Sequence, residues 1–257
     1  MNRLLDRSIP ALVFVALLAA WEGGVWLAAL PPYVLPAPGL IGRTLVADWA
    51  VLSASLWVTL RITALALALA TGIGVALAIL FAQWRWLERS FFPVAVILQV
   101  TPIIAIAPLL LVYLDPGPAV LACAFLVAFF PILSNTALGL ASADQNLRDL
   151  FQLYGASRWQ EMALLRLPSA LPFALGGLRI AGGLALIGAI AAEIAAGAAG
   201  QGAGLAYRIV EAGYRLNIPR MFAALVLISV AGVIIFLALE ALSRLLLRRW
   251  REAGRAS

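Results

Sequence analysis

The sequence contains no histidine and no lysine, and its one cysteine is Cys123. Without histidine the chain lacks the commonest general base and metal ligand, and a single cysteine can form neither an intramolecular disulfide nor a cysteine-based metal site. An intramembrane enzyme is disfavoured further because Ser134 and Ser229 have no nearby activating partner in the sequence. Charge is scarce as well: 12% of the 257 residues are charged, against about a quarter in soluble domains. With 64% hydrophobic residues, the surface of this chain is predicted to face lipid.

Long apolar runs occupy most of the chain. A helix needs about 20 residues to cross a hydrocarbon core about 30 Å thick. We expect six spanning helices in an all-α integral membrane protein, at residues 9–30, 62–84, 90–114, 116–143, 180–192 with extensions at both ends, and 221–239. No clear cleavage site precedes residue 31, which favours a retained anchor helix over a signal peptide. The predicted organisation is an anchor helix at 1–30, an external connection at 31–56, a transmembrane domain at 57–250 with a cytoplasmic segment at 142–172, and a tail at 251–257.

Arginine supplies all 18 basic residues, and its distribution predicts an orientation. Four groups fall on one side of a six-span chain, at positions 3 and 7, 85 and 89, 148 to 166, and 244 to 255. The clear loop arginines of the other side are Arg43, Arg208, Arg215 and Arg220. Because cytoplasmic loops carry the excess of basic residues, we expect both termini in the cytoplasm. This distribution explains the net charge of +6 without a nucleic-acid partner.

A polar insert, DLFQLYGASRWQEMALLRLPSALP at residues 149–172, separates the fourth and fifth runs. Apolar residues at three- and four-residue spacing predict a short amphipathic helix that ends at Gly155. A second short helix at 157–167 is expected to end where Pro168 and Pro172 turn the chain back into the membrane. One interpretation is a solvated loop on the lipid headgroups. The other, which two helices, a glycine break and a proline stop favour, is a rigid surface that receives a partner.

The insert resembles a signature of the membrane permeases of bacterial ABC importers. That signature is Glu-Ala-Ala, three residues, Gly, nine residues, Ile, any residue and Leu-Pro. Here Asp-Leu-Phe at 149–151 precedes Gly155 and LRLP at 165–168, and every interval matches, although the two alanines are replaced. Further resemblance, to the nitrate, sulfonate and taurine branch, lies in LPAPGLIGRTL, TPIIAIAPLLLVYL, FFPILSNTALGL and AAEIAAGAAGQGAGLAY. The stretch LDPGP at 114–118 is the weakest match.

The resemblance implies an anchor helix followed by a five-helix type I importer core, which forms the path for a small solute in the bacterial inner membrane. It also implies three protein partners, in addition to membrane lipid. These are a separate ATP-binding subunit that binds ATP and Mg, an external solute-binding protein, and a second permease copy, with a homodimer as the default. The first helix of the insert would dock in a groove of the ATP-binding subunit. The residues thereby assigned to coupling are Asp149, Leu150, Phe151, Tyr154, Gly155, Ala156, Arg158, Leu167 and Pro168.

ATP chemistry is expected outside this chain, because the chain contains no G-x-x-x-x-G-K-[S/T] phosphate loop. We therefore expect neither catalysis nor a bound cofactor or metal. The sequence does not select the solute among a sulfonate, taurine, nitrate and a pyrimidine-like nutrient. An ion-coupled secondary transporter is the alternative, and it would need acids near mid-membrane. The central parts of the second, third, fourth and sixth runs contain no ionisable group.

Polar residues inside the runs provide candidates for the path. Four prolines, at 93, 102, 108 and 131, interrupt the third and fourth runs and free carbonyls that need protein or water nearby. We expect these two helices to line the path, with Gln99, Thr101 and Asn135 as polar candidates. Glu193 is the fourth candidate, and both a path-lining role and a structural, hydrogen-bonded role remain open for it. Glu22 lies beside two tryptophans and is expected at the membrane interface.

Two further features have open interpretations. Arg179 either snorkels to the cytoplasmic boundary or serves gating or a subunit contact. The glycine pairs at 72 and 74, 176 and 177, and 182 and 183 are expected to let helices pack closely, with hinge motion as the alternative.

Overall fold

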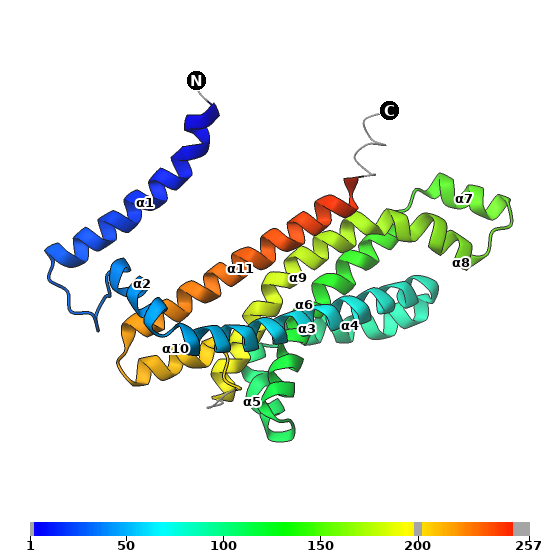
Figure 1. Cartoon of the computed structure of the whole chain (residues 1–257). Helices are drawn as coiled ribbons and strands as arrows, with labels where there is room; N and C mark the ends of the chain where they lie inside the picture. Colours follow the sequence, from blue (N-terminus) through cyan, green and yellow to red (C-terminus); the bar gives the residue numbers. More distant parts are fainter. Residues whose placement is uncertain (1–2, 198–201, 249–257) are drawn as a thin grey trace.

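The computed structural model describes residues 3–197 and 202–248, and every regular element in those ranges is a helix (Figure 1). The α-helices are α1 (Arg3–Leu27), α2 (Pro38–Ala47), α3 (Trp49–Gln83), α4 (Arg85–Val100), α5 (Ile103–Tyr113), α6 (Pro116–Ala141), α7 (Gln145–Leu153), α8 (Arg158–Glu161), α9 (Leu167–Ala196), α10 (Leu205–Tyr214) and α11 (Ile218–Leu246). A π-helical turn, η1 (Met162–Arg166), joins α8 to α9. The predicted all-α membrane fold is confirmed, and the predicted tail at 251–257 lies outside the described residues.

Within the described residues, four helices are long and apolar enough to cross a membrane: α3, α6, the continuous helix Arg158–Ala196 and α11. The pair α4 and α5 counts as a fifth span if it is taken as one broken helix. The N-terminal helix α1 contributes a shorter apolar stretch, Leu12–Leu27. The expected total of six spans therefore stays a prediction that depends on how the broken pair and α1 are counted.

The third predicted span is broken rather than straight. The helix axis bends by 100° between its halves, α4 and α5, at Thr101 and Pro102. Proline cannot donate the helical hydrogen bond, and it disfavours helical geometry in the residue before it, which explains the break at this position. The other three prolines, at 93, 108 and 131, lie inside helices that continue past them. Only one of the four proline interruptions thus divides a span.

Helices α3, α6 and α9 form the centre of the bundle, with α11 packed beside α9 (Figure 1). Small residues allow this packing: a Cβ on Gly177 would lie 2.7 Å from the Pro131 carbonyl oxygen, and a Cβ on Gly74 would lie 3.0 Å from Ile132 Cγ2. A Cβ on Gly182 would overlap Leu239 of α11. One glycine of each predicted pair therefore lies at a close helix contact, while the other faces open space.

The predicted external connection, residues 31–56, includes the start of a long helix. Helix α2 ends at Ala47, and residues 49–56 are the first turns of α3, which is long enough to cross a membrane. Leu52 and Ser55 are buried there, at 0% and 2% exposure. The break between α2 and α3 lies at Asp48, where the backbone departs from helical geometry, and the boundary of the transmembrane domain stays a prediction.

The polar insert also differs in its second half. Its first helix is confirmed, since α7 ends directly before Tyr154 and Gly155. The second helix does not stop at Pro168, because α8, η1 and α9 form one helical run from Arg158 to Ala196. The π-helical turn lies immediately before Pro168, and wider turns of this kind accommodate the missing proline donor inside a membrane helix.

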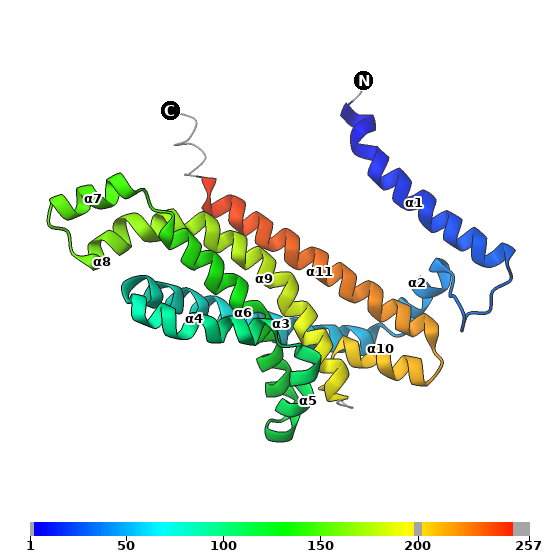
Figure 2. The ribbon, with the colours of Figure 1, turned by 180° about the vertical axis from the view of Figure 1, so that it is seen from behind.

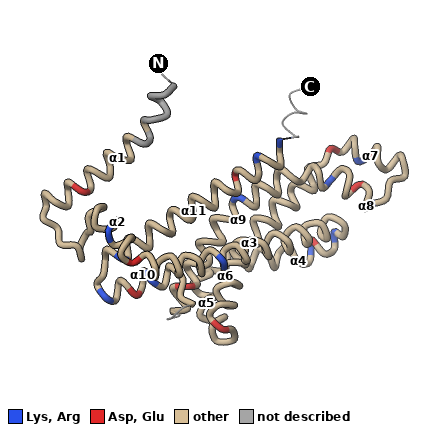
Figure 3. Tube along the Cα trace, in the orientation of Figure 1, with Lys and Arg blue, Asp and Glu red and all other residues tan. Residues whose placement is uncertain are grey.

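Charged residues gather at two ends of the bundle (Figure 3). One end contains α7, α8, the α3–α4 turn and the end of α11, and the other contains α2, α10 and the start of α11 (Figures 1 and 2). This separation matches the two groups of arginines that the sequence predicts. Helix α1 leans away from the bundle in both views, although Trp21 contacts Phe222 of α11 with ring centroids 6.0 Å apart.

Candidate functional site

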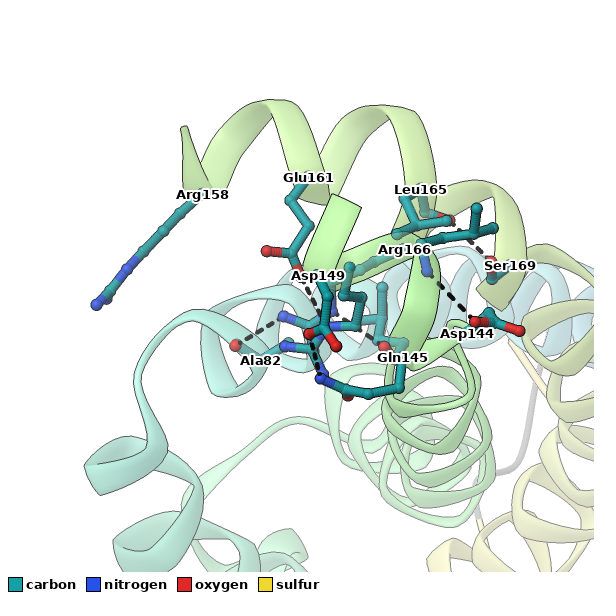
Figure 4. Close-up of polar contacts among 12 residues, drawn as sticks. Ala82, Asp144, Gln145, Asp149, Arg158, Glu161, Leu165, Arg166 and Ser169 are labelled. Atoms are coloured by element: carbon teal, nitrogen blue, oxygen red, sulfur yellow. Dashed lines mark hydrogen bonds and ion pairs between the residues drawn. The ribbon is translucent and has the colours of Figure 1, made fainter. Parts of the chain in front are cut away.

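The polar insert begins with a short capped helix. The Asp144 side chain accepts hydrogen bonds from the backbone N–H groups of Asn146 and Leu147, at 2.7 and 3.3 Å, and so caps α7. One turn further on, the Gln145 amide donates to the Asp149 carboxylate at 2.9 Å (Figure 4). These bonds matter because an isolated helix of nine residues is not stable in water.

Gly155 ends this helix in the left-handed conformation, at φ = +69°. The Gly155 N–H donates to the Gln152 carbonyl at 3.0 Å, and the Ala156 N–H donates to the Phe151 carbonyl at 2.9 Å. This pair of bonds is the Schellman motif, which satisfies carbonyls at a helix end and favours glycine at the left-handed position. The predicted end of the helix at Gly155 is confirmed, and a Cβ on Gly155 would meet no atom within 4 Å.

The chain then returns through α8, and we call residues 144–161 the α7–α8 hairpin. Ser157 and Gln160 form a capping box, with the Ser157 hydroxyl accepting from the Gln160 N–H and the Gln160 side chain accepting from the Ser157 N–H. Arg148 of α7 forms an ion pair with Glu161 of α8 at 2.8 Å. The hairpin is therefore closed at its turn, at the start of α8 and across its two helices.

Arg166 fastens the base of the hairpin to the bundle. Its guanidinium donates to the Leu140 carbonyl at the end of α6, at 3.0 Å, and to the Ala82 carbonyl at the end of α3, at 3.1 Å (Figure 4). The Gln83 amide donates to the Arg158 carbonyl at 3.4 Å, while the Arg158 side chain extends away from these contacts. Movement of the hairpin is thus tied to the ends of two spanning helices.

The tip of the hairpin exposes apolar side chains. Leu153 and Tyr154 are each 84% exposed, and Leu150 is 45% exposed. The remaining predicted coupling residues divide by burial: Asp149, Gly155 and Arg158 are exposed, whereas Phe151, Ala156, Leu167 and Pro168 are partly buried. An exposed apolar tip on a polar, capped support is typical of a surface that a partner covers.

Sequence reasoning missed four residues that build this site: Leu153, Arg148, Glu161 and Arg166. The helical spacing of the apolar residues could have singled out Leu153, because it lies three residues beyond Leu150. No sequence signal pairs Arg148 with Glu161, since the pairing depends on how the two helices fold back on each other. The carbonyl contacts of Arg166 join helix ends that are far apart in the sequence.

A cavity of about 300 Å³ lies at the bend between α4 and α5. Gln99, Thr101 and Pro102 line it from the bend, and Leu126, Val127 and Pro131 of α6 line it from the opposite side, together with Leu184 of α9. The Thr101 hydroxyl donates to the Ile97 carbonyl at 2.8 Å. The bend thus brings two of the four predicted path residues into one cavity, whose described lining contains no charged side chain.

Asn135 and Glu193 lie elsewhere. The Asn135 amide donates to the Pro131 carbonyl at 2.8 Å, where α6 packs against Gly177 of α9. Glu193 is 5% exposed and accepts from the Thr59 hydroxyl at 2.8 Å and from the Ala206 N–H at 3.1 Å. The carboxylate therefore caps the start of α10, which is the structural role left open by the sequence, and a path-lining role for it stays a prediction.

A second acid caps a helix at the same end of the molecule. Glu22 of α1 accepts from the Gly39 N–H of α2 at 2.7 Å. Asp48 and Arg220 form a two-bond ion pair at 2.6 and 2.8 Å, which joins the α2–α3 junction to the start of α11. These contacts hold α2 and α10 against the spanning helices at the end opposite the α7–α8 hairpin.

Two other charged clusters have structural partners. Glu211 lies between Arg208 and Arg215 at 2.8 and 3.0 Å, and the hydrogen bond from Arg208 holds the pKa of the Glu211 carboxyl below its usual value. Inside the bundle, Arg179 of α9 forms an ion pair with Glu240 of α11 at 2.5 Å. Arg179 therefore has an acidic partner on a neighbouring helix, and both interpretations of its role stay predictions. No group of three or more His, Cys, Asp or Glu residues within residues 3–197 and 202–248 is arranged to hold a metal ion.

Comparison with known proteins identifies related chains. Residues 68–252 match the family model described as binding-protein-dependent transport system inner membrane component. The riboflavin transport system permease protein RibX of Chloroflexus aurantiacus is 36% identical over 238 residues, which cover 90% of this chain and 86% of that protein. The formylaminopyrimidine transport permease protein ThiX of Halalkalibacterium halodurans is 33% identical, over 98% of this chain and 99% of that protein. Among solved structures, an amino acid ABC transporter crystallised with histidines matches with a TM-score of 0.65 at 16% identity, over 80% of this chain and 97% of that chain, and shows the same fold.

Proposed function

The chain belongs to the binding-protein-dependent transport system inner membrane component family, the permease subunits of ABC importers, and we propose that its α7–α8 hairpin couples it to a separate ATP-binding subunit. The observation that carries this proposal is the exposed apolar tip formed by Leu150, Leu153 and Tyr154 on a support closed by caps and an ion pair. A groove that covers the tip would move it as the ATP-binding subunits close and open. Arg166 would pass that movement to the ends of α3 and α6.

ATP and Mg belong to the partner subunit in this proposal, and two copies of the permease would enclose one path as a homodimer. The end that contains α2 and α10 would face outward, toward a solute-binding protein. This orientation, with both termini in the cytoplasm of a bacterial inner membrane, follows from the excess of arginine at the hairpin end. The ion pairs and acid caps at the opposite end give α2 and α10 a fixed surface, which supports contact with a solute-binding protein there.

The cavity at the α4–α5 bend is our candidate for part of the path. Its polar groups are the Gln99 amide and the Thr101 hydroxyl, and its other lining residues are apolar apart from the backbone. An inorganic anion or a sulfonate would lose hydration there without gaining an opposite charge. A neutral, pyrimidine-like solute fits this lining better, and RibX and ThiX carry names of transport systems for molecules with such rings.

Co-purification and ATPase assays test the coupling. Leu153→Asp and Tyr154→Asp, each a single change at the tip, should reduce both co-purification of the ATP-binding subunit and ATPase stimulation. Tyr214→Asp is the matched control, because Tyr214 is 87% exposed at the opposite end of the molecule. Equal losses in all three variants, or none in the tip variants, would remove the coupling proposal.

Cysteine labelling tests the orientation separately. In a Cys123→Ala background, a cysteine at Tyr214 should react with an impermeant reagent in intact cells. A cysteine at Leu153 should react only after permeabilisation. The reverse pattern would place the α7–α8 hairpin outside the cell and exclude contact with a cytoplasmic ATPase.

A further inference from the structure

An apolar cleft opens between α3, α4 and α6 at the hairpin end of the bundle. It has a volume of about 380 Å³, and every residue that lines it is apolar. Leu80 and Phe81 line it from α3, Val94 from α4 and Leu133 from α6. Such a cleft on a membrane protein suits a hydrocarbon chain, because it offers no polar group to a solute.

One basic cavity adjoins this cleft, and a second adjoins the first. The nearer one, of about 370 Å³, shares Phe81 with the cleft and is also lined by Arg85, Arg148 and Arg166. These three arginines also line the outer one, of about 640 Å³, which lies under the α7–α8 hairpin and adds Arg158. The apolar cleft therefore borders a basic chamber, the name that we give to the two basic cavities together.

The chamber has more positive than negative charge. Its acids are Glu88 and Glu161, and Arg148 already pairs with Glu161. Arg166 donates to two neutral carbonyls, so its own charge has no ion-pair partner among the described residues. The Arg85 guanidinium has no hydrogen-bond or ion-pair partner within the part of the chain that the structure describes. At least one guanidinium, that of Arg85, is thus available to an anion beside the partly buried guanidinium of Arg166.

Two tryptophans mark this chamber as a membrane-interface position. Trp84 and Trp86 line the outer cavity and are 42% and 64% exposed. Indole rings prefer the headgroup level of a bilayer. The apolar cleft would then lie at acyl-chain depth and the arginines at phosphate depth.

We propose that the cleft and the two basic cavities bind one anionic phospholipid, with an acyl chain between α3 and α4 and the headgroup phosphate on Arg85 and Arg166. Basic pockets between membrane helices on the cytoplasmic side are suited to such headgroups. A soluble phosphate would use the arginines but leave the cleft unused. The assignment to the cytoplasmic leaflet rests on the proposed orientation of the permease, whereas the binding itself does not.

The bound phosphate would bridge two parts of the coupling machinery. Arg85 is the first residue of α4, directly after the α3–α4 turn, and Arg166 lies at the base of the α7–α8 hairpin. An anion between them would offset their mutual repulsion and hold the hairpin at a fixed height relative to α3. Anionic lipid would thereby favour the hairpin position that the ATP-binding subunit receives.

Lipid binding to the purified full-length chain tests the proposal, with native mass spectrometry as the readout. The probes are phosphatidylglycerol, phosphatidylcholine with the same acyl chains, and inorganic phosphate. Three variants separate the parts of the site: Arg85→Gln removes a phosphate contact, and Val94→Trp narrows the cleft without changing charge. Arg89→Gln is the matched control, because Arg89 lies one turn from Arg85 on the same helix but lines none of these cavities.

We expect phosphatidylglycerol to bind more tightly than phosphatidylcholine, and Arg85→Gln to weaken it about fivefold, the effect of one basic residue at an anionic surface. Val94→Trp should weaken the lipid but not inorganic phosphate, and Arg89→Gln should change neither. Equal binding of the two lipids, equal effects of Arg85→Gln and Arg89→Gln, or phosphate binding as tight as lipid binding would each overturn the proposal. Because no ATP-binding subunit is present in this assay, its failure would leave the coupling proposal standing, and the reverse also holds.

Discussion

The left-handed turn at Gly155 allows the coupling proposal to be tested through the backbone, while Leu150, Leu153 and Tyr154 of the apolar tip stay unchanged. A substitution there adds a Cβ that meets no atom within 4 Å, so the perturbation is confined to the backbone. The left-handed conformation costs an ordinary L-residue about 1–2 kcal/mol, and a β-branched residue is especially unfavourable there. Asparagine tolerates the conformation better than most residues. Gly155→Val and Gly155→Asn therefore form a matched pair at one position.

The effect of the Gly155 substitution depends on the size of the structural unit that the lost free energy destabilises. A loss of 1–2 kcal/mol is small for a bundle of spanning helices, so insertion and overall folding should be normal. The same loss is large for α7, which has nine residues and depends on its caps and the Arg148–Glu161 ion pair. It corresponds to a rise of about 5- to 30-fold in the equilibrium constant for local opening of the α7–α8 hairpin.

Hydrogen exchange and ATPase stimulation together provide the assay. In Gly155→Val, the amides of α7 should exchange faster while those of α9 keep their protection, and stimulation of the ATP-binding subunit should fall. Gly155→Asn should lie close to the unmodified chain in both measurements. If Gly155→Val opened the hairpin yet left stimulation unchanged, the hairpin would not be the coupling element. If exchange in α7 were unaffected, the energetic argument itself would be wrong.

Local backbone structure could be predicted from the sequence wherever a single residue decides the conformation. The end of α7 at Gly155 was predicted because a left-handed helix end strongly favours glycine. Interruptions were predicted at four prolines because proline lacks the donor that a helix needs, but the helix breaks only at Pro102. At Pro168 the same rule led to a wrong expectation. A preceding π-helical turn lets the helix pass through the proline, and proline chemistry does not reveal that adjustment.

The polar contacts between helices could not be predicted from the sequence, because they join segments that are distant in the sequence. Glu193 illustrates the difficulty, since its partners Thr59 and Ala206 come from two other helices. Periodicity places Glu193 inside a helix and composition marks it as unusual, but neither specifies what it bonds. Arg179 and Glu240 present the same difficulty, as either could equally have faced a water-filled path.

Two remaining predictions concern the end of the molecule opposite the α7–α8 hairpin. Gly204→Ala should lower the thermal unfolding temperature of the purified chain, because its Cβ would overlap the Glu193 carboxylate. Glu193→Ala should partly relieve that loss in the double variant, and additive losses would argue against the contact. Glu211→Gln should destabilise α10 at neutral pH, where the unmodified carboxylate is ionised between Arg208 and Arg215. Since these arginines lower the folded-state pKa of Glu211 below its ordinary value of 4.5, the stability that the charge provides is complete above that value. It is lost as the pH falls through the lower folded-state pKa. The difference in unfolding temperature between the unmodified chain and Glu211→Gln should therefore be constant from pH 7 to about pH 5 and shrink in more acidic buffer. A difference that grew on acidification would show that the cluster does not stabilise the ionised form of Glu211.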